Sequence, residues 1–278
     1  MRNILIIAEL TFREARRRRI VWTALGLGAA FITLFGTGFF FIHRDIAESM
    51  RGRDIALYSG FSSVVMAGLY VVSFLGVMLA VLTSVGTLSG EIASHTIQTL
   101  AVKPVRRWTI VFGKWLGLCL MLTAYIALLV AGLLAATWII SGYSPPNALR
   151  GLSLIALQAI IMLTVSILGG VRFSTIANGV FAFMLYGLAF IGGWIEQIGS
   201  FTHNDTAVDI GILSSLLVPS EAMWKLAAYA MQPPAIRSLP VSPFAMASAP
   251  SPAMVIYAIL YTASLLVLAM RSFNRRDL

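Results

Sequence analysis

The chain has 278 residues, of which 59% are hydrophobic and only 11% are charged, and its mean hydropathy is +0.88. This composition excludes an ordinary water-soluble enzyme and predicts a membrane protein, because a soluble domain cannot bury so large an apolar fraction. The formal net charge of +9 is explained by basic residues that flank membrane helices and attract anionic headgroups. Nucleic acid is not an expected partner, because the sequence has no soluble face that combines basic and aromatic side chains.

Residues 1–19 predict an amphipathic elbow helix that lies in the membrane interface before the first span. Its apolar and small residues recur at helical spacing, as Ile4, Ile7, Ala8, Thr11, Phe12 and Ala15, and the opposite face carries Asn3, Glu9, Arg13 and Arg16. Headgroup anchoring is expected of Arg16, Arg17, Arg18 and Arg19. A plain charged anchor is the alternative. A cleaved signal peptide is not expected, because the following apolar run is too long.

Six apolar runs are long enough to cross the membrane, since a helix needs about 20 residues to span roughly 30 Å of hydrocarbon. Continuous rather than alternating hydrophobicity favours helices over a barrel. The predicted spans cover residues 20–42, 62–86, 110–141, 149–169, 175–195 and 253–270. The predicted fold class is an all-α membrane protein with one transmembrane domain over residues 1–278.

The positions of Lys and Arg predict the orientation, because these residues accumulate on the cytoplasmic side of short loops. With the N-terminus inside, most of the 20 Lys and Arg residues lie on the cytoplasmic side, and the exceptions are Arg44, Arg51, Arg53, Arg150, Lys225 and Arg237. Both termini are therefore expected to be cytoplasmic.

Residues 87–109 form a compact polar segment between the second and third predicted spans. Pro104 biases Lys103 away from helical geometry, so a helix of about two turns over residues 94–102 should end there. Glu91 precedes the N-terminus of that helix, where the helix dipole favours a carboxylate. One helical face would hold His95, Gln98, Thr99 and Val102. We interpret this segment as a cytoplasmic docking helix, and an ordinary solvated loop is the alternative.

Several polar side chains within the spans are candidates for a transport pathway, namely Ser73, Thr83, Gln158, Ser166 and Asn178. Hydrogen bonds between helices would explain them equally well. Apart from Arg150 at the very start of the fourth predicted span, Lys114 is the one Asp, Glu, Lys or Arg inside the predicted spans. It lies close enough to the cytoplasmic end to reach headgroups, as Arg106 and Arg107 do. Ion coupling within this chain is disfavoured, because secondary transporters place ionisable residues near the membrane midplane.

Catalytic motifs are absent from the sequence. It has no Gly-x-Ser-x-Gly, no His-Glu-x-x-His and no P-loop, since Gly113-Lys114 is followed by Trp115. His43, His95 and His203 are widely scattered, and the 12 methionines do not cluster at ligand spacing. The sequence therefore predicts no catalytic residue, no metal site and no cofactor in this chain.

Residues 196–252 form a long external connection before the last predicted span, broken late by several prolines. Between residues 210 and 229 the connection is apolar enough to form a helix, which could re-enter the membrane as an outer lid. A seventh span is not expected, because Pro219, Glu221 and Lys225 would lie in hydrocarbon.

The polar segment and the start of the third span together resemble the signature of ABC-2 type permeases, the membrane subunits of many bacterial ATP-driven exporters. The matching residues are Glu91, Thr96, Ile97, Leu100, Pro104, Arg107, Gly113 and Lys114, whereas position 95, often Gly in the family, is His. The N-terminal amphipathic helix, the segment 217–224 and the basic C-terminal tail at residues 273–278 are also similar to the family.

This resemblance implies a permease subunit of an ATP-binding cassette exporter in a bacterial or archaeal cytoplasmic membrane. It implies two copies of a separate P-loop ATPase, which bind ATP and Mg²⁺, and a second permease copy or homologue. The docking helix would then be the coupling helix, contacting the ATPase through Glu91, His95, Thr96, Ile97, Gln98 and Thr99. The alternatives are an ion-coupled secondary transporter and a membrane assembly factor that transports nothing.

Overall fold

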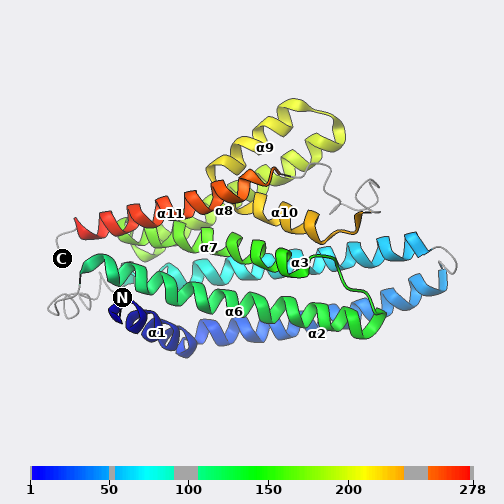
Figure 1. Cartoon of the computed structure of the whole chain (residues 1–278), viewed down its shortest axis with the longest axis horizontal. Helices are drawn as coiled ribbons and strands as arrows, with labels where there is room; N and C mark the ends of the chain where they lie inside the picture. Colours follow the sequence, from blue (N-terminus) through cyan, green and yellow to red (C-terminus); the bar gives the residue numbers. More distant parts are fainter. Residues whose placement is uncertain (1, 50–53, 91–105, 235–249, 276–278) are drawn as a thin grey trace.

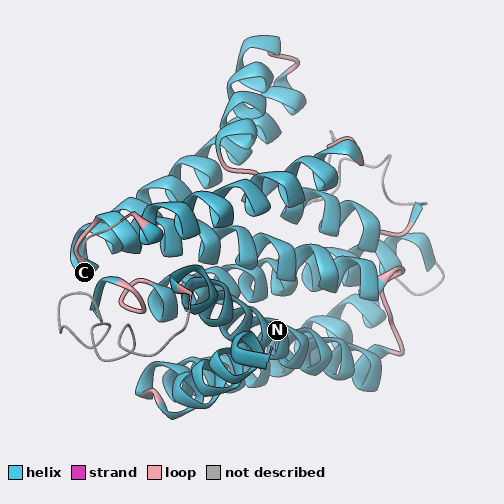
Figure 2. Ribbon diagram, turned by 60° about the vertical axis from the view of Figure 1, so that its left-hand side comes forward, coloured by secondary structure: helices cyan, strands magenta, loops and turns pink. Residues whose placement is uncertain are grey.

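The computed structural model describes residues 2–49, 54–90, 106–234 and 250–275, which form α-helices and short connections without any strand (Figure 2). Six helices in these ranges are long and apolar enough to cross a membrane. They are α2 (Arg19–Ser49), α3 (Asp54–Ser84), α6 (Arg107–Ser141), α7 (Ala148–Arg172), α8 (Thr175–Thr202) and α11 (Ala253–Asn274). The predicted all-α membrane fold with six spans is confirmed.

Three further helices complete the described part of the chain: α1 (Arg2–Arg17), α9 (Asp205–Leu217) and α10 (Ser220–Met231). Helices α9 and α10 are bent by 109° relative to each other, so the pair forms either a broken span or a re-entrant segment. The break falls at Val218 and Pro219, and proline has no backbone N–H to continue a helix. Residues 210–229, for which the sequence predicts one helix, are therefore divided between two.

The spans run alternately up and down through the bundle (Figure 1). Helix α1, the end of α3, the start of α6 and the end of α11 lie together at one end of the bundle, which we call the terminal end. The end of α2, the start of α3 and the connection from α6 to α7 lie at the opposite end. The second half of α8 and the antiparallel α9 project from the remaining helices as a hairpin.

Helix α7 lies at the centre of the bundle and contacts α3, α6, α8, α10 and α11. Most of its side chains are buried, whereas α2 and α11 are largely exposed. The core between α3, α6 and α7 contains the fully buried residues Leu69, Leu122, Ile126, Leu133 and Ile161. The exposed surfaces of the peripheral helices are rich in Leu, Ile and Phe, which suits contact with lipid rather than water.

Local sequence signals determine where several helices end. Helix α6 ends at Gly142, whose φ of 66° lies in the left-handed region that glycine adopts without strain. Helix α8 begins after Ser174, whose side chain accepts a hydrogen bond from the Ala177 N–H. The sequence predicts an end of the fifth span at residue 195, but α8 continues to Thr202, because the terminating residues are His203, with a φ of 53°, and the N-cap Asn204 of α9.

Candidate functional site

At the terminal end of the bundle, helix α1 packs closely against the first turns of α6. A Cβ atom at Gly117 would lie 2.5 Å from the Ala8 carbonyl oxygen and 2.9 Å from the Thr11 Cβ. One at Gly113 would lie 2.7 Å from the Ile7 Cγ2. Two glycines four residues apart therefore allow the two helices to cross at short distance, as small residues do in membrane proteins.

The faces of α1 agree with the spacing of its residues in the sequence. Ala8, Thr11 and Ala15 are buried against the bundle, whereas Glu9 and Arg13 are exposed and form an ion pair with each other. The structure adds a third stripe, because Leu5, Ile6 and Leu10 are also exposed. A helix with one packed stripe, one exposed apolar stripe and one charged stripe is suited to a membrane interface.

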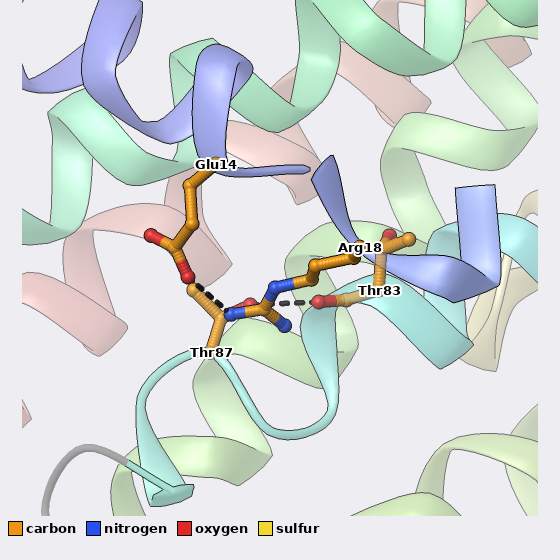
Figure 3. Close-up of polar contacts among 4 residues, drawn as sticks. All are labelled: Glu14, Arg18, Thr83 and Thr87. Carbon is orange, nitrogen blue, oxygen red and sulfur yellow. Dashed lines mark hydrogen bonds and ion pairs between the residues drawn. The ribbon is translucent and has the colours of Figure 1, made fainter. Parts of the chain in front are cut away.

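Arg18, directly after α1, lies beside the end of α3. Its guanidinium Nη2 lies 2.7 Å from the Glu14 Oε1. Directly after α3, the Thr87 hydroxyl donates to the Thr83 carbonyl oxygen of that helix at 2.7 Å, and Figure 3 shows the guanidinium between Glu14 and this end of α3. Leu118 of α6 lines the same small cavity as these four residues, so α1, α3 and α6 meet at one point.

The predicted docking residues Glu91, His95, Thr96, Ile97, Gln98 and Thr99 lie outside the described residues. The segment 91–105 that contains them connects Gly90 with Arg106, and α3 and α6 both reach the terminal end beside α1. Any force applied to this segment therefore enters the bundle next to the junction of α1, α3 and α6.

The predicted anchoring residues occupy different environments. Arg16, Arg17, Arg19 and Arg106 are exposed, and Arg18 and Arg107 are partly buried. Lys114 differs from the expectation, because it is only 6% exposed and lies on the face of α6 that packs into the bundle. Headgroup anchoring by Lys114 stays a prediction from the sequence.

The predicted pathway residues make hydrogen bonds that join helices. Ser73 of α3 donates to the Gln158 Oε1 of α7 at 3.0 Å. Asn178 of α8 donates from its Nδ2 to the carbonyl oxygens of Val85, at 3.1 Å, and Ser166, at 2.9 Å. These contacts fit the alternative in which such residues hold helices together.

Thr83 and some polar atoms of Gln158 and Ser166 make no hydrogen bond between helices. Thr83 donates to the Leu79 carbonyl oxygen of its own helix at 2.7 Å, so it makes no such bridge. Within the described ranges, the Gln158 Nε2 and the Ser166 Oγ are buried without a hydrogen-bond partner. The structure thus brings Ser73 next to Gln158, and Ser166 next to Asn178, but does not gather all five residues into one site.

A buried charged cluster that sequence reasoning missed lies between α8 and α10. The Lys225 Nζ is 2.7 Å from the Glu196 Oε2, and the two side chains are 4% and 8% exposed. Glu221, one turn before Lys225 on α10, is 3% exposed. The three residues form what we call the Glu–Lys–Glu cluster. Its one signal in the sequence was the spacing of Glu221 and Lys225, which places them on the same helical face.

Small residues allow the cluster to form. Gly193 of α8 faces the side chain of Glu221, and Gly211 of α9 faces that of Glu196. The sequence argument against charges in this region assumed contact with hydrocarbon, whereas the structure encloses Glu221 and Lys225 in protein. Lys114 is therefore not the one ionisable residue buried in the bundle.

Comparison with known families decides what kind of protein carries these features. A family model described as ABC-2 family transporter protein matches residues 5–278. The chain belongs to the ABC-2 transporter family. The match runs from α1 to the end of α11, and together with the six candidate spans it makes the chain a permease subunit. A search of curated proteins found no match to the permease.

Proposed function

We propose that the permease is the membrane subunit of an ATP-driven exporter and that a separate P-loop ATPase supplies the energy. The observation that carries this proposal is the family match over residues 5–278. The sequence of the permease contains no P-loop, so ATP and Mg²⁺ would bind to the ATPase and not to this chain.

The junction of α1, α3 and α6 supports a mechanical role for the terminal end. Glu91, Thr96 and Ile97 would contact the ATPase, and a movement of residues 91–105 would act on α3 and α6 at the same time. Helix α1 would follow α6, because Gly117 brings the two backbones into contact. The Ser73–Gln158 hydrogen bond would pass the movement on to the central helix α7.

The distribution of charge supports a cytoplasmic location of the terminal end. Basic residues of the described ranges gather there, with Arg13, Arg16, Arg17, Arg18, Arg19, Arg106, Arg107, Arg172, Arg271 and Arg275. The positive-inside rule then places both termini in the cytoplasm. A second permease copy or homologue would cover part of the exposed apolar surface, because six spans alone hardly enclose a substrate.

Reversal of one charge tests the contact with the ATPase. The permease is reconstituted into lipid vesicles with a P-loop ATPase from the neighbouring reading frames, and ATP hydrolysis is measured with and without the permease. Glu91→Arg should abolish the stimulation of ATP hydrolysis. The matched control is Glu9→Arg, which makes the same charge change at an exposed position of α1 and should leave stimulation intact. Normal stimulation by Glu91→Arg would contradict the docking role.

Thiol labelling tests the orientation. The one cysteine of the chain, Cys119, is buried, so a membrane-impermeant maleimide should report mainly on introduced cysteines. In intact spheroplasts, Thr206→Cys at the start of α9 should be labelled, and Ser94→Cys should be labelled only after the membrane is opened. The reverse pattern would refute the topology. Transport that continues without the ATPase and stops with a protonophore would instead favour an ion-coupled transporter.

A further inference from the structure

A cavity of about 440 Å³ lies between the projecting hairpin, α10 and the start of α11. This volume is within the range of small-molecule binding sites. Its walls are mainly apolar, with Ile212 and Leu216 from α9 and Met254 and Tyr257 from α11. The Tyr257 hydroxyl donates to the Leu216 carbonyl oxygen, and this bond holds the first turn of α11 against the end of α9.

Two polar side chains of the lining are buried. Glu196 contributes the charge of the cavity, and it belongs to the Glu–Lys–Glu cluster. Ser215 is 6% exposed, and its Oγ has no hydrogen-bond partner among the described residues. A buried hydroxyl without a partner is costly, and a ligand in the cavity can satisfy it. The cavity therefore combines apolar walls with a small number of polar groups, as ligand sites do.

The ionisable groups around the cavity are mostly acidic. The cluster holds two carboxylates, Glu196 and Glu221, but one ammonium, Lys225. Over residues 196–234 the sequence has four acidic residues, Glu196, Asp205, Asp209 and Glu221, and one basic residue, Lys225, although the whole chain carries a net charge of +9. A buried carboxyl without a partner of opposite sign is neutralised by a proton, so a second cation in the cluster can replace that proton on Glu221.

An organic cation fits the lining better than a metal ion does. Within the described residues, no group of three or more His, Cys, Asp or Glu side chains could hold a metal. The ring of Tyr257 is the kind of aromatic surface on which organic cations bind. Apolar walls beside a carboxylate favour a ligand that is hydrophobic and carries one positive charge.

We propose that this cavity binds a lipophilic organic monocation, with Glu196 as its counter-ion. Lys225 lies one helical turn after Glu221, at the spacing at which two side chains of a helix can pair, and the Glu221 Oε2 is buried without a hydrogen-bond partner among the described residues. Lys225 would turn from Glu196 to Glu221 as the ligand arrives. Glu221 would release its proton to solvent, each carboxylate would then face one cation, and no buried charge would stay unpaired.

The site lies within one chain, so its test needs neither the ATPase nor a direction of transport. Tetraphenylphosphonium binding to the purified permease is measured by equilibrium dialysis in detergent, with tetraphenylborate as an anion of the same shape. We expect saturable binding of the cation at one site per chain and no saturable binding of the anion. Glu196→Gln should weaken cation binding at least tenfold.

A second pair of variants tests the cavity without changing any charge. Ala253→Trp places a large ring in the cavity lining and should abolish binding. Ala263→Trp lies at an exposed position of the same helix, outside the lining, and should leave binding unchanged. The proposal is overturned if the cation does not saturate, if the anion binds equally well, or if Ala253→Trp binds normally. Thermal unfolding of each variant, followed at the buried Cys119, shows that the compared proteins are folded.

Discussion

The contact between α1 and α6 makes a quantitative prediction at Gly117. In Gly117→Ala, the added methyl group would lie 2.5 Å from the Ala8 carbonyl oxygen. The optimum for two non-bonded heavy atoms is about 3.5 Å, so α1 must retreat by roughly 1 Å. The obstacle is backbone and cannot rotate away. Overpacking of this kind typically costs about 1–3 kcal/mol.

Gly26→Ala is the matched control, because no atom lies within 4 Å of a Cβ at that position of α2. Both variants gain the better helix propensity of alanine, about 1 kcal/mol in water-soluble helices. The difference between them therefore measures the clash with α1. With Tm changing by roughly 2–4 °C per kcal/mol for a domain of 150–250 residues, Gly117→Ala should melt several degrees below Gly26→Ala.

The chain provides its own reporter for this measurement. Cys119 is the single cysteine and is 7% exposed, so a thiol-reactive coumarin dye becomes fluorescent as the core opens on heating. Wild type, Gly117→Ala and Gly26→Ala are compared in the same detergent. Equal Tm values for the two variants would refute the close packing of α1 on α6 and, with it, the proposed transmission of movement from α6 to α1.

Two further predictions use the same assay. Asn178→Ala removes the donor that serves the carbonyl oxygens of Val85 and Ser166, so it should lower the free energy of unfolding by about 1–2 kcal/mol. Gln158→Leu loses one hydrogen bond to Ser73 together with the unpartnered Nε2, so it should lower the free energy of unfolding by less. The reverse order would contradict these assignments. Arg18→Gln breaks the ion pair with Glu14, whose two side chains are 34% and 53% exposed, so the free energy of unfolding should change by no more than about 0.5 kcal/mol. A Tm drop as large as that of Asn178→Ala would show that Arg18 makes a stronger contact than this ion pair.

The sequence was sufficient to predict the six spans and the face of α1 that packs against the bundle. Crossing the hydrocarbon layer requires about 20 apolar residues in a row, a local property that neighbouring helices do not alter. The periodicity of Ala8, Thr11 and Ala15 is equally local, and these residues are the buried ones. The close packing of α1 against the glycines at positions 113 and 117 was visible only in the structure.

The course of residues 196–234 could not be read from composition. Pro219, Glu221 and Lys225 argued against a seventh span, because the cost of a charge was taken as that of a side chain in hydrocarbon. That cost depends on partners from other helices, and Lys225 finds Glu196 on α8. The docking role of Glu91 to Thr99 stays a prediction from the sequence.

The sequence by itself determined the six long apolar helices and which face of α1 packs, because hydrophobicity and helical period are properties of consecutive residues. The tertiary structure alone decided which polar groups meet. Asn178 reaches Val85, Ser73 reaches Gln158, and Glu196 pairs with Lys225. These partners are far apart in the chain, and the burial of a polar group is favourable only once folding has brought its partner into place.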